Sequence, residues 1–226
     1  MGSKKTKKNS NYKIDFTKPE NTEVLDKRKN LIILIVSISL AVLFIGGMVW
    51  GIIASHVPEV YYVEMDFGEY GKIVIEADGT QAPKTAANFY KLVKKDFYDG
   101  LTIFRAQKNF VIQGGKDDSV KLSPIVGEFA SNGYDNNISH TRGVISMART
   151  SDPDSATSQF FITLHDNARS SLDGKYAAFG RVVEGMDAVD KIAEALFKCS
   201  SDSMGFVSDS DAIKIVKATI LKNYTK

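Results

Sequence analysis

The sequence predicts a mainly β protein: a closed antiparallel barrel capped by two helices and preceded by one transmembrane helix. Short runs of strand-forming residues recur from residue 60 almost to the C-terminus, and only two stretches among them have helical spacing. Strands and helices do not alternate as the βαβ order of a parallel sheet requires. An uncharged apolar run precedes this whole region.

The N-terminal 30 residues are basic and poor in apolar side chains. They carry nine Lys or Arg against four Asp or Glu, so the net charge of +2 leaves the remainder of the chain slightly acidic. A segment of this composition cannot bury enough surface to fold. We expect residues 1–30 to form a disordered basic tail in the cytoplasm.

Residues 31–54 form a run of 24 positions without a charged side chain. As a helix the run is about 36 Å long, enough to cross a hydrocarbon core of about 30 Å. It is longer than the core of a cleaved signal peptide and no clear cleavage site follows, so we favour an uncleaved signal anchor. Lys27, Arg28 and Lys29 precede it, whereas the first charges after it are acidic. The positive-inside rule then places everything beyond the short linker 55–59 outside the cytoplasmic membrane.

The globular domain begins with a pattern of period two. From Tyr61 to Phe67 every second side chain faces a predicted core, and after the turn GEYG the strand-like KIVIEA follows. We therefore expect a hairpin with one buried face. Pro83 opens a helical stretch whose apolar side chains share one side, and YDG at 98–100 closes it.

The rest of the barrel is predicted from later strand-like runs and a second helix. The runs lie at 103–106, 109–113, 143–148, 160–164, 178–183 and 213–221. Residues 186–197 have apolar side chains at helical spacing. The segment 116–142 is rich in turn signals and is expected to be a surface loop. The predicted domain spans residues 60–222, and 223–226 form a short tail.

Motifs of several functional classes are absent from the sequence. A nucleophile elbow, a Walker loop and a His-Glu zinc motif are all missing. His56, His140 and His165 lack ligand spacing and Cys199 is the single cysteine, so we expect no metal site, no intrachain disulfide and no cofactor. The domain has no basic stripe with interleaved aromatics, and we expect no nucleic-acid partner.

One charged residue interrupts an apolar, strand-forming run. Arg105 stands in IFRAQKNFVIQGG, five residues before a phenylalanine and eight before a glutamine. Taken alone, it is most simply interpreted as a solvated charge at a strand edge. The aromatic residues that follow along the chain make a site around it an alternative.

Five blocks of the sequence together carry a resemblance. In chain order they are FYDGLTIFR, FVIQGG, GVISMA, SQFFITL and LDGKYAAFGRVVEGMDAVDKI. This combination resembles the cyclophilin family of peptidyl-prolyl cis-trans isomerases over roughly residues 60–222, here in a membrane-anchored bacterial form. The resemblance implies a closed eight-stranded antiparallel barrel with a helix at each end, and an isomerase that needs no metal or other cofactor.

The resemblance also implies the site residues. Arg105 falls at the position of the catalytic arginine. The substrate-binding positions are Phe110, Val111, Gln113, Ala148, Arg149, Gln159, Phe161, Leu172 and Tyr176. Phe110, Val111, Phe161 and Leu172 are implied to line a proline pocket with Tyr176 at its edge. The two glutamines are implied to be polar site residues, and Ala148 and Arg149 to contact the substrate through their backbone.

Three features depart from the family pattern, and one of them is AQKNF at 106–110, where the family usually has Ile-Pro-Gly-Phe. Phe104 stands where the family usually has a histidine, and Ser171 stands where many members have a tryptophan that contacts cyclosporin. Because Arg105 is retained, we expect an active enzyme. Because Ser171 replaces the tryptophan, we expect this enzyme to bind cyclosporin weakly.

The resemblance implies a role in protein folding. The expected partners are proline-containing polypeptides, secreted or membrane proteins that fold at the outer face of the cytoplasmic membrane. The lipid bilayer would be contacted through residues 31–54. The alternative is a non-catalytic proline-peptide-binding or scaffold module, and the presence of Arg105 favours the enzyme.

Overall fold

The structure is a computed structural model that describes residues 29–45, 59–200, 203–222 and 224. The chain divides into two compact units, Met1–His56 and Val57–Lys226. In the first unit residues 29–45 form a helix. No helix in the described ranges is both long and apolar enough to cross a bilayer. Residues 46–54 of the predicted span, residues 1–28 of the predicted tail and most of the linker lie outside the described residues.

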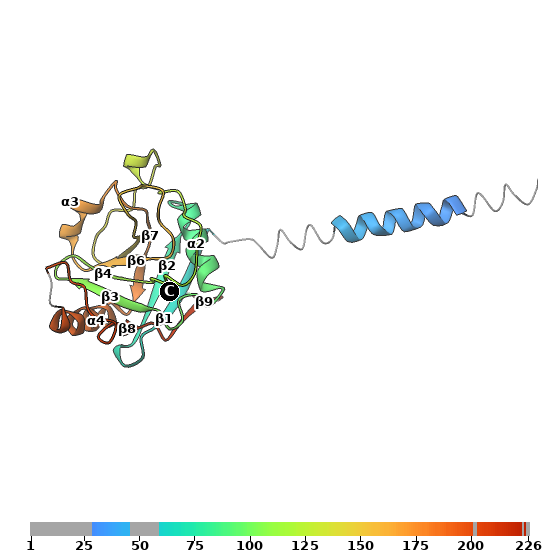
Figure 1. Ribbon diagram of the computed structural model, residues 1–226. Coiled ribbons are helices and arrows are strands. Elements are labelled where there is room, and N and C mark those ends of the chain that lie inside the picture. The colour runs from blue at the N-terminus through green and yellow to red at the C-terminus, as the bar shows by residue number, and fades with distance from the viewer. Residues whose placement is uncertain (1–28, 46–58, 201–202, 223, 225–226) are drawn as a thin grey trace, which may run out of the picture. The chain divides into compact units, whose positions relative to one another are not determined.

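The second unit is built on a curled antiparallel sheet (Figure 1). Its order is β8-β3-β4-β6-β5-β7-β2-β1-β9. The strands are β1 (Val60–Asp66), β2 (Lys72–Asp78), β3 (Thr102–Gln107), β4 (Val111–Gly114), β5 (Val144–Met147), β6 (Phe160–Thr163), β7 (Ala178–Glu184), β8 (Ile213–Lys214) and β9 (Lys217–Leu221). Each predicted run of alternating or apolar residues therefore contains a strand, and the mainly β antiparallel prediction is confirmed. In the described residues the order ends at β8 on one side and β9 on the other, so the sheet is curled and is not the closed barrel that was predicted.

The two edge strands of the sheet are neighbours in the chain. Only Ile215 and Val216 separate β8 from β9. The N–H of Ile215 donates to Leu101 O at 2.7 Å, whereas the N–H of Val216 donates to Asp66 O at 2.8 Å. This change of partner splits the run predicted as one strand at 213–221, so the sheet has nine strands where eight were predicted.

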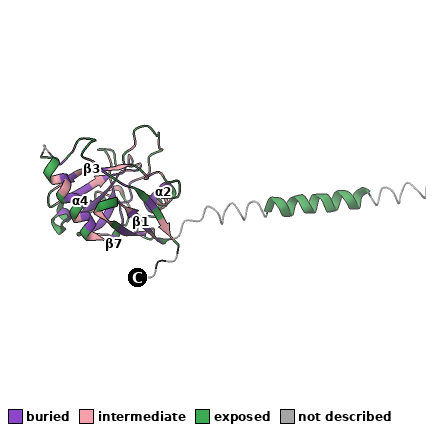
Figure 2. Cartoon of the chain, turned by 90° about the horizontal axis from the view of Figure 1, so that it is seen from below, coloured by how far each residue is buried: buried purple, intermediate pink, exposed green. Residues whose placement is uncertain are grey.

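In the hairpin of β1 and β2, buried side chains of the two strands pair on one face. Val63 pairs with Ile75 and Met65 with Ile73, and all four side chains are fully buried. The sites between them along β1 are only partly buried. Figure 2 shows buried residues gathered on the strands and on the inner sides of the helices. The hairpin thus contributes one face to the core, as the alternation predicts.

Two helices pack on the sheet. They are α2 (Pro83–Val93), against β2, β7 and β9, and α4 (Met186–Cys199), against β2 and β3. The predicted first helix was wrong at its end, because the chain leaves the helix after Val93 and continues in turns with Asp96 at φ 53°. A short helix, α3 (Arg169–Leu172), was not predicted. Four residues are too few to show a helical period.

A buried carboxylate caps α2 from a distant part of the chain. The N-cap position, Ala82, has no side chain that could accept a hydrogen bond from the first turn. Glu128 accepts instead, from the N–H groups of Lys84 at 3.0 Å and Thr85 at 2.8 Å and from the Thr85 hydroxyl at 2.7 Å. The segment predicted as a surface loop, 116–142, therefore contributes a fully buried acidic side chain to the fold.

The apolar side chains form two clusters. Phe160 belongs to the main core with Phe89 and Phe179, whereas its neighbour Phe161 packs outside that core with Val111 and Leu172. The two phenylalanines point to opposite faces of β6 because side chains alternate along a strand. The second cluster is where the predicted site residues gather.

Candidate functional site

A cleft of about 320 Å³ opens over the second apolar cluster. Its walls come from β3, β4, β6, α3 and the segments that follow β5 and α4. The lining residues are Arg105, Phe110, Val111, Gln113, Ala148, Arg149, Phe161, Leu172, Tyr176, Met204 and Phe206. The structure thus brings Arg105 and eight of the nine predicted substrate-binding residues into one cleft.

The remaining predicted residue, Gln159, lies directly beside this cleft. Its Oε1 accepts a 3.0 Å hydrogen bond from Nε2 of Gln113. Gln159 also lines a smaller hollow of about 250 Å³ that shares Gln113, Ala148 and Arg149 with the main cleft. The concave surface therefore continues from the cleft past Gln113 to Gln159.

Arg105 is held at the cleft by side-chain and backbone acceptors. Nη1 donates to Gln113 Oε1 at 2.9 Å, Nη2 to Gln107 Oε1 at 2.7 Å and Nε to Met204 O at 2.8 Å. All three of these acceptors are neutral oxygen atoms. The solvated-edge interpretation of Arg105 does not describe this geometry.

The apolar wall of the cleft is built by packing against β4 and β6. Val111, Phe161 and Leu172 are almost fully buried, and Phe110 is partly exposed at the mouth. Asn109 has a φ of 57°, a left-handed conformation that asparagine tolerates. The turn at Asn109 ends one residue before β4, which therefore starts at Val111 and not at residue 109 as predicted.

Tyr176 and Arg149 close one side of the cleft. The Tyr176 ring meets Phe161 edge to face at 5.5 Å, and the guanidinium carbon of Arg149 lies 4.7 Å from the centre of the Tyr176 ring. Arg149 also donates from Nη2 to Lys175 O at 2.8 Å. The N–H of Ala148 donates to Gln159 O at 2.8 Å. These contacts fix the strand end that carries Ala148 and Arg149 against the cleft.

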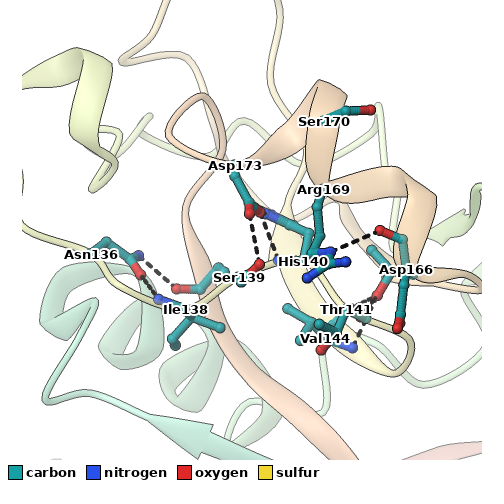
Figure 3. Close-up of polar contacts among 12 residues, drawn as sticks. Asn136, Ile138, Ser139, His140, Thr141, Val144, Asp166, Arg169, Ser170 and Asp173 are labelled. Atoms are coloured by element: carbon teal, nitrogen blue, oxygen red, sulfur yellow. Dashed lines mark hydrogen bonds and ion pairs between the residues drawn. The ribbon is translucent and has the colours of Figure 1, made fainter.

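A polar pair supports the apolar wall from behind. Asp173 follows Leu172 in the chain. It accepts hydrogen bonds from the backbone N–H of His140 at 2.7 Å and from the Ser139 hydroxyl at 2.6 Å (Figure 3). His140 Nδ1 lies 2.8 Å from Asp173 Oδ1, and the buried His140 ring is stacked on Phe161 at 5.9 Å between ring centres. The pair therefore ties the segment that carries Leu172 to the ring that forms the pocket wall.

The environment of this pair sets its protonation. Burial lowers the pKa of His140, and this effect outweighs the hydrogen bond and the charge of Asp173. Burial raises the pKa of Asp173, but the hydrogen bonds from His140 and Ser139 bring it below its ordinary value. The pair is thus a neutral imidazole with its proton on Nδ1 beside a carboxylate. In the described part of the chain, His140 Nε2 has no hydrogen-bond partner.

Met204 and Phe206 line the cleft but were missed in the sequence. They lie between α4 and β8, in a polar segment without strand or helix periodicity. The one available signal was a pair of large apolar residues flanking a glycine within that polar stretch. Among the described residues, no group of three or more His, Cys, Asp or Glu side chains is placed to hold a metal ion.

Comparison with known proteins agrees with this geometry. Residues 62–220 match the family described as cyclophilin type peptidyl-prolyl cis-trans isomerase/CLD. A peptidyl-prolyl cis-trans isomerase of Acinetobacter baylyi is 45% identical over 157 residues, which cover 66% of this chain and 79% of that protein. Peptidyl-prolyl cis-trans isomerase B of Escherichia coli is 38% identical over 129 residues, covering 54% of this chain and 79% of that protein.

Solved structures show the same fold. A cyclophilin type peptidyl-prolyl cis-trans isomerase of Cryptosporidium parvum superposes with a TM-score of 0.59 at 25% identity, covering 73% of this chain and 99% of that one. A second structure of that protein, determined in the presence of the dipeptide Ala-Pro, superposes with a TM-score of 0.58 at 26% identity and covers 72% of this chain and 99% of that one.

Proposed function

Because this chain belongs to the cyclophilin-type peptidyl-prolyl cis-trans isomerases, it is an isomerase of X-Pro peptide bonds, and we propose that Arg105 is its catalytic residue. The observation that carries the proposal is the position of the Arg105 guanidinium, held by Gln113, Gln107 and Met204 at the mouth of an apolar cleft. The residues predicted to bind substrate line that cleft or adjoin it.

The chemistry of the reaction explains why a charge belongs beside an apolar pocket. Rotation about a peptide bond faces a barrier of about 18–20 kcal/mol because resonance gives the C–N bond partial double-bond character. In the twisted state the prolyl nitrogen regains its lone pair. A fixed cationic donor stabilises that state more than either planar state, which is the requirement for catalysis. Arginine stays charged and presents its donors in a rigid plane.

The apolar wall holds the other half of the substrate. Phe110, Val111, Phe161 and Leu172 form a surface suited to a proline ring, with no charged atom among their side chains. Burying the ring there fixes the prolyl side of the X-Pro peptide bond while the carbonyl group of the preceding residue rotates near Arg105. Covalent bonds neither form nor break, so the chain's own residues need only bind, orient and stabilise charge.

We propose a setting for this activity from the N-terminal sequence. The uncharged run 31–54, flanked by basic residues before it and acidic residues after it, supports a signal anchor with the isomerase domain outside the cytoplasmic membrane of a bacterium. Clients there would be secreted or membrane polypeptides whose proline bonds limit folding. The serine at position 171 supports weak binding of cyclosporin in the same cleft.

An isomerisation assay on proline-containing peptides tests the assignment of Arg105. The full chain in detergent should accelerate cis-trans exchange, and Arg105→Ala should lower kcat/KM at least tenfold, or about 1.4 kcal/mol. Arg149→Ala, which removes a second arginine of the same cleft, should have a smaller effect. A folded Arg105→Ala protein with normal turnover would contradict the proposal, and an inactive wild-type chain that still binds peptide would favour the scaffold alternative.

The topology has a test that uses the single cysteine. Cys199 is exposed at the end of α4. In cells stripped of their wall, a membrane-impermeant maleimide should label it without lysis if the domain lies outside. Cys199→Ser is the control for specificity, and labelling only after lysis would overturn the proposed orientation.

A further inference from the structure

Two large apolar side chains are exposed at one rim of the cleft. Met204 is 52% exposed and Phe206 is 42% exposed. Among the described residues from 59 onward, the other exposed large apolar side chains are the valines at 60, 120 and 216, and none of these lines the cleft. Two neighbouring exposed apolar side chains at the rim of a cleft are suited to contact an apolar group of a ligand bound there.

The rim is rigidly attached to the strand that carries Arg105. Ala106 donates its N–H to Gly205 O at 2.8 Å, and Val207 donates its N–H to Phe104 O at 3.1 Å. Gly205 has a φ of 81°, and a Cβ there would come within 2.1 Å of Ala106 O. Only glycine allows this approach, so the turn presents Met204 and Phe206 in a fixed position beside β3.

The Phe206 ring is in contact with both the catalytic position and its neighbour. It stacks on Phe104 with 6.2 Å between ring centres and 12° between planes. The guanidinium carbon of Arg105 lies 5.3 Å from the centre of the Phe206 ring. Phe104, which departs from the family pattern, thus has a stacking partner in Phe206.

We propose that Met204 and Phe206 form a subsite that binds a large apolar side chain next to the substrate proline. The inference rests on the proposed function of the cleft. Phe110, Met204 and Phe206 line the same cleft, and consecutive residues of an extended peptide are about 3.3–3.6 Å apart, so a peptide with its proline ring against Phe110 would place a neighbouring residue at the Met204 and Phe206 rim. The charge of Arg105 disfavours lysine or arginine in that place. The preferred substrates are therefore proline bonds flanked by aromatic or large aliphatic residues.

Peptides that differ only in one residue beside the proline test the subsite. Phe, Ala and Lys are placed in turn on each side of the proline, and kcat/KM is measured with the full chain in detergent. On one side of the proline, kcat/KM for the Phe peptide should be about threefold to tenfold higher than for the Ala peptide, which is the range expected for one aromatic contact. The Lys peptide should have the lowest kcat/KM. Phe206→Ala should bring the Phe to Ala ratio close to one, Phe206→Leu should leave it intermediate, and Met204→Ala should reduce it less.

The ratio separates substrate recognition from a structural effect. Val216→Ala removes an exposed apolar side chain outside the cleft and should leave the ratio unchanged. If Phe206→Ala lowers turnover of all peptides equally, the residue only positions Arg105 and the subsite is refuted. If wild type shows no preference on either side, the subsite is also refuted. In both cases a large loss of activity in Arg105→Ala would leave the proposed catalytic role of Arg105 standing, whereas normal turnover in that variant would overturn the role.

Discussion

Nη1 of Arg105 donates a 2.9 Å hydrogen bond to Oε1 of Gln113, which is its register partner across β3 and β4. Gln113 in turn donates from Nε2 to Gln159 Oε1 at 3.0 Å. The orientation of the arginine is therefore set by a chain of amides that runs from β3 through β4 to Gln159, the residue before β6. Since preorganisation of a charge determines how well it stabilises a transition state, the amides should matter for turnover.

We expect Gln113→Leu to lower kcat about tenfold, or about 1.4 kcal/mol, while the protein stays folded. The loss arises because the guanidinium loses one acceptor and the Gln159 carbonyl loses its donor. The measurement is the isomerisation assay with thermal unfolding as a check on stability. Gln81→Leu, a glutamine outside the cleft, is the matched control. Unchanged kcat in Gln113→Leu would show that the remaining acceptors of Arg105 suffice.

The strands were predictable because their signal is local. Alternation in β1 and β2 and apolar runs in β5 and β6 depend only on which residues follow one another. The split between β8 and β9 was not predictable, because it depends on hydrogen bonds to Leu101 and Asp66, which lie far away in the sequence. The site residues were identified by resemblance, whereas Met204 and Phe206 had no periodic context that would place them at the cleft.

The cap of α2 illustrates a contact that sequence spacing cannot reveal. Glu128 lies more than forty positions from Lys84 and Thr85 in the first turn that it caps, so no local motif joins them. We expect Glu128→Ala to lower the free energy of unfolding by about 2 kcal/mol, because buried N–H groups lose their acceptor. Glu128→Gln should cost less, since one amide oxygen remains. Urea denaturation measures both.

The control for this prediction is Glu194→Ala on the exposed side of α4. It should change the unfolding free energy by less than about 0.5 kcal/mol. A Glu128→Ala protein as stable as this control would show that water replaces the carboxylate at the helix end.

His140 should make the protein less stable in mild acid. Burial holds its pKa below the ordinary value of 6.5, so the unfolded chain binds a proton more readily than the folded one. The free energy of unfolding should therefore be highest above about pH 6.5. It should fall as the pH decreases towards the lowered pKa, by at most about 1.4 kcal/mol per pH unit for one proton. Asp173, whose pKa is also lowered, adds to the loss only below about pH 4.

Unfolding free energies measured between pH 7.5 and 5 check this dependence. His140→Asn keeps a donor for Asp173 but cannot titrate, so its stability should vary less over this range. His165→Asn removes an exposed histidine and should leave the slope of the wild type. A wild-type protein equally stable at pH 7.5 and pH 5 would contradict a neutral, buried His140.

The last prediction concerns Ser171, which is exposed on α3 beside the cleft residue Leu172. The family resemblance implies that a tryptophan at this position contacts cyclosporin through its indole N–H and ring. A serine hydroxyl is too short to replace either contact. The loss of an indole at the centre of an interface can cost about 2 kcal/mol or more, about thirtyfold in affinity. Wild type should therefore be an active isomerase with weak cyclosporin sensitivity.

Ser171→Trp should increase inhibition by cyclosporin about thirtyfold while changing peptide turnover little, because the apolar wall that would hold the proline does not include this residue. Ser170→Trp is the matched control: it adds the same side chain one position earlier, about 100° around the helix, where it should not improve inhibition. Inhibition of the unmodified protein at nanomolar cyclosporin would refute the explanation. An equal gain in both variants would show that any added aromatic surface on α3 suffices, and that the position before Leu172 has no special role.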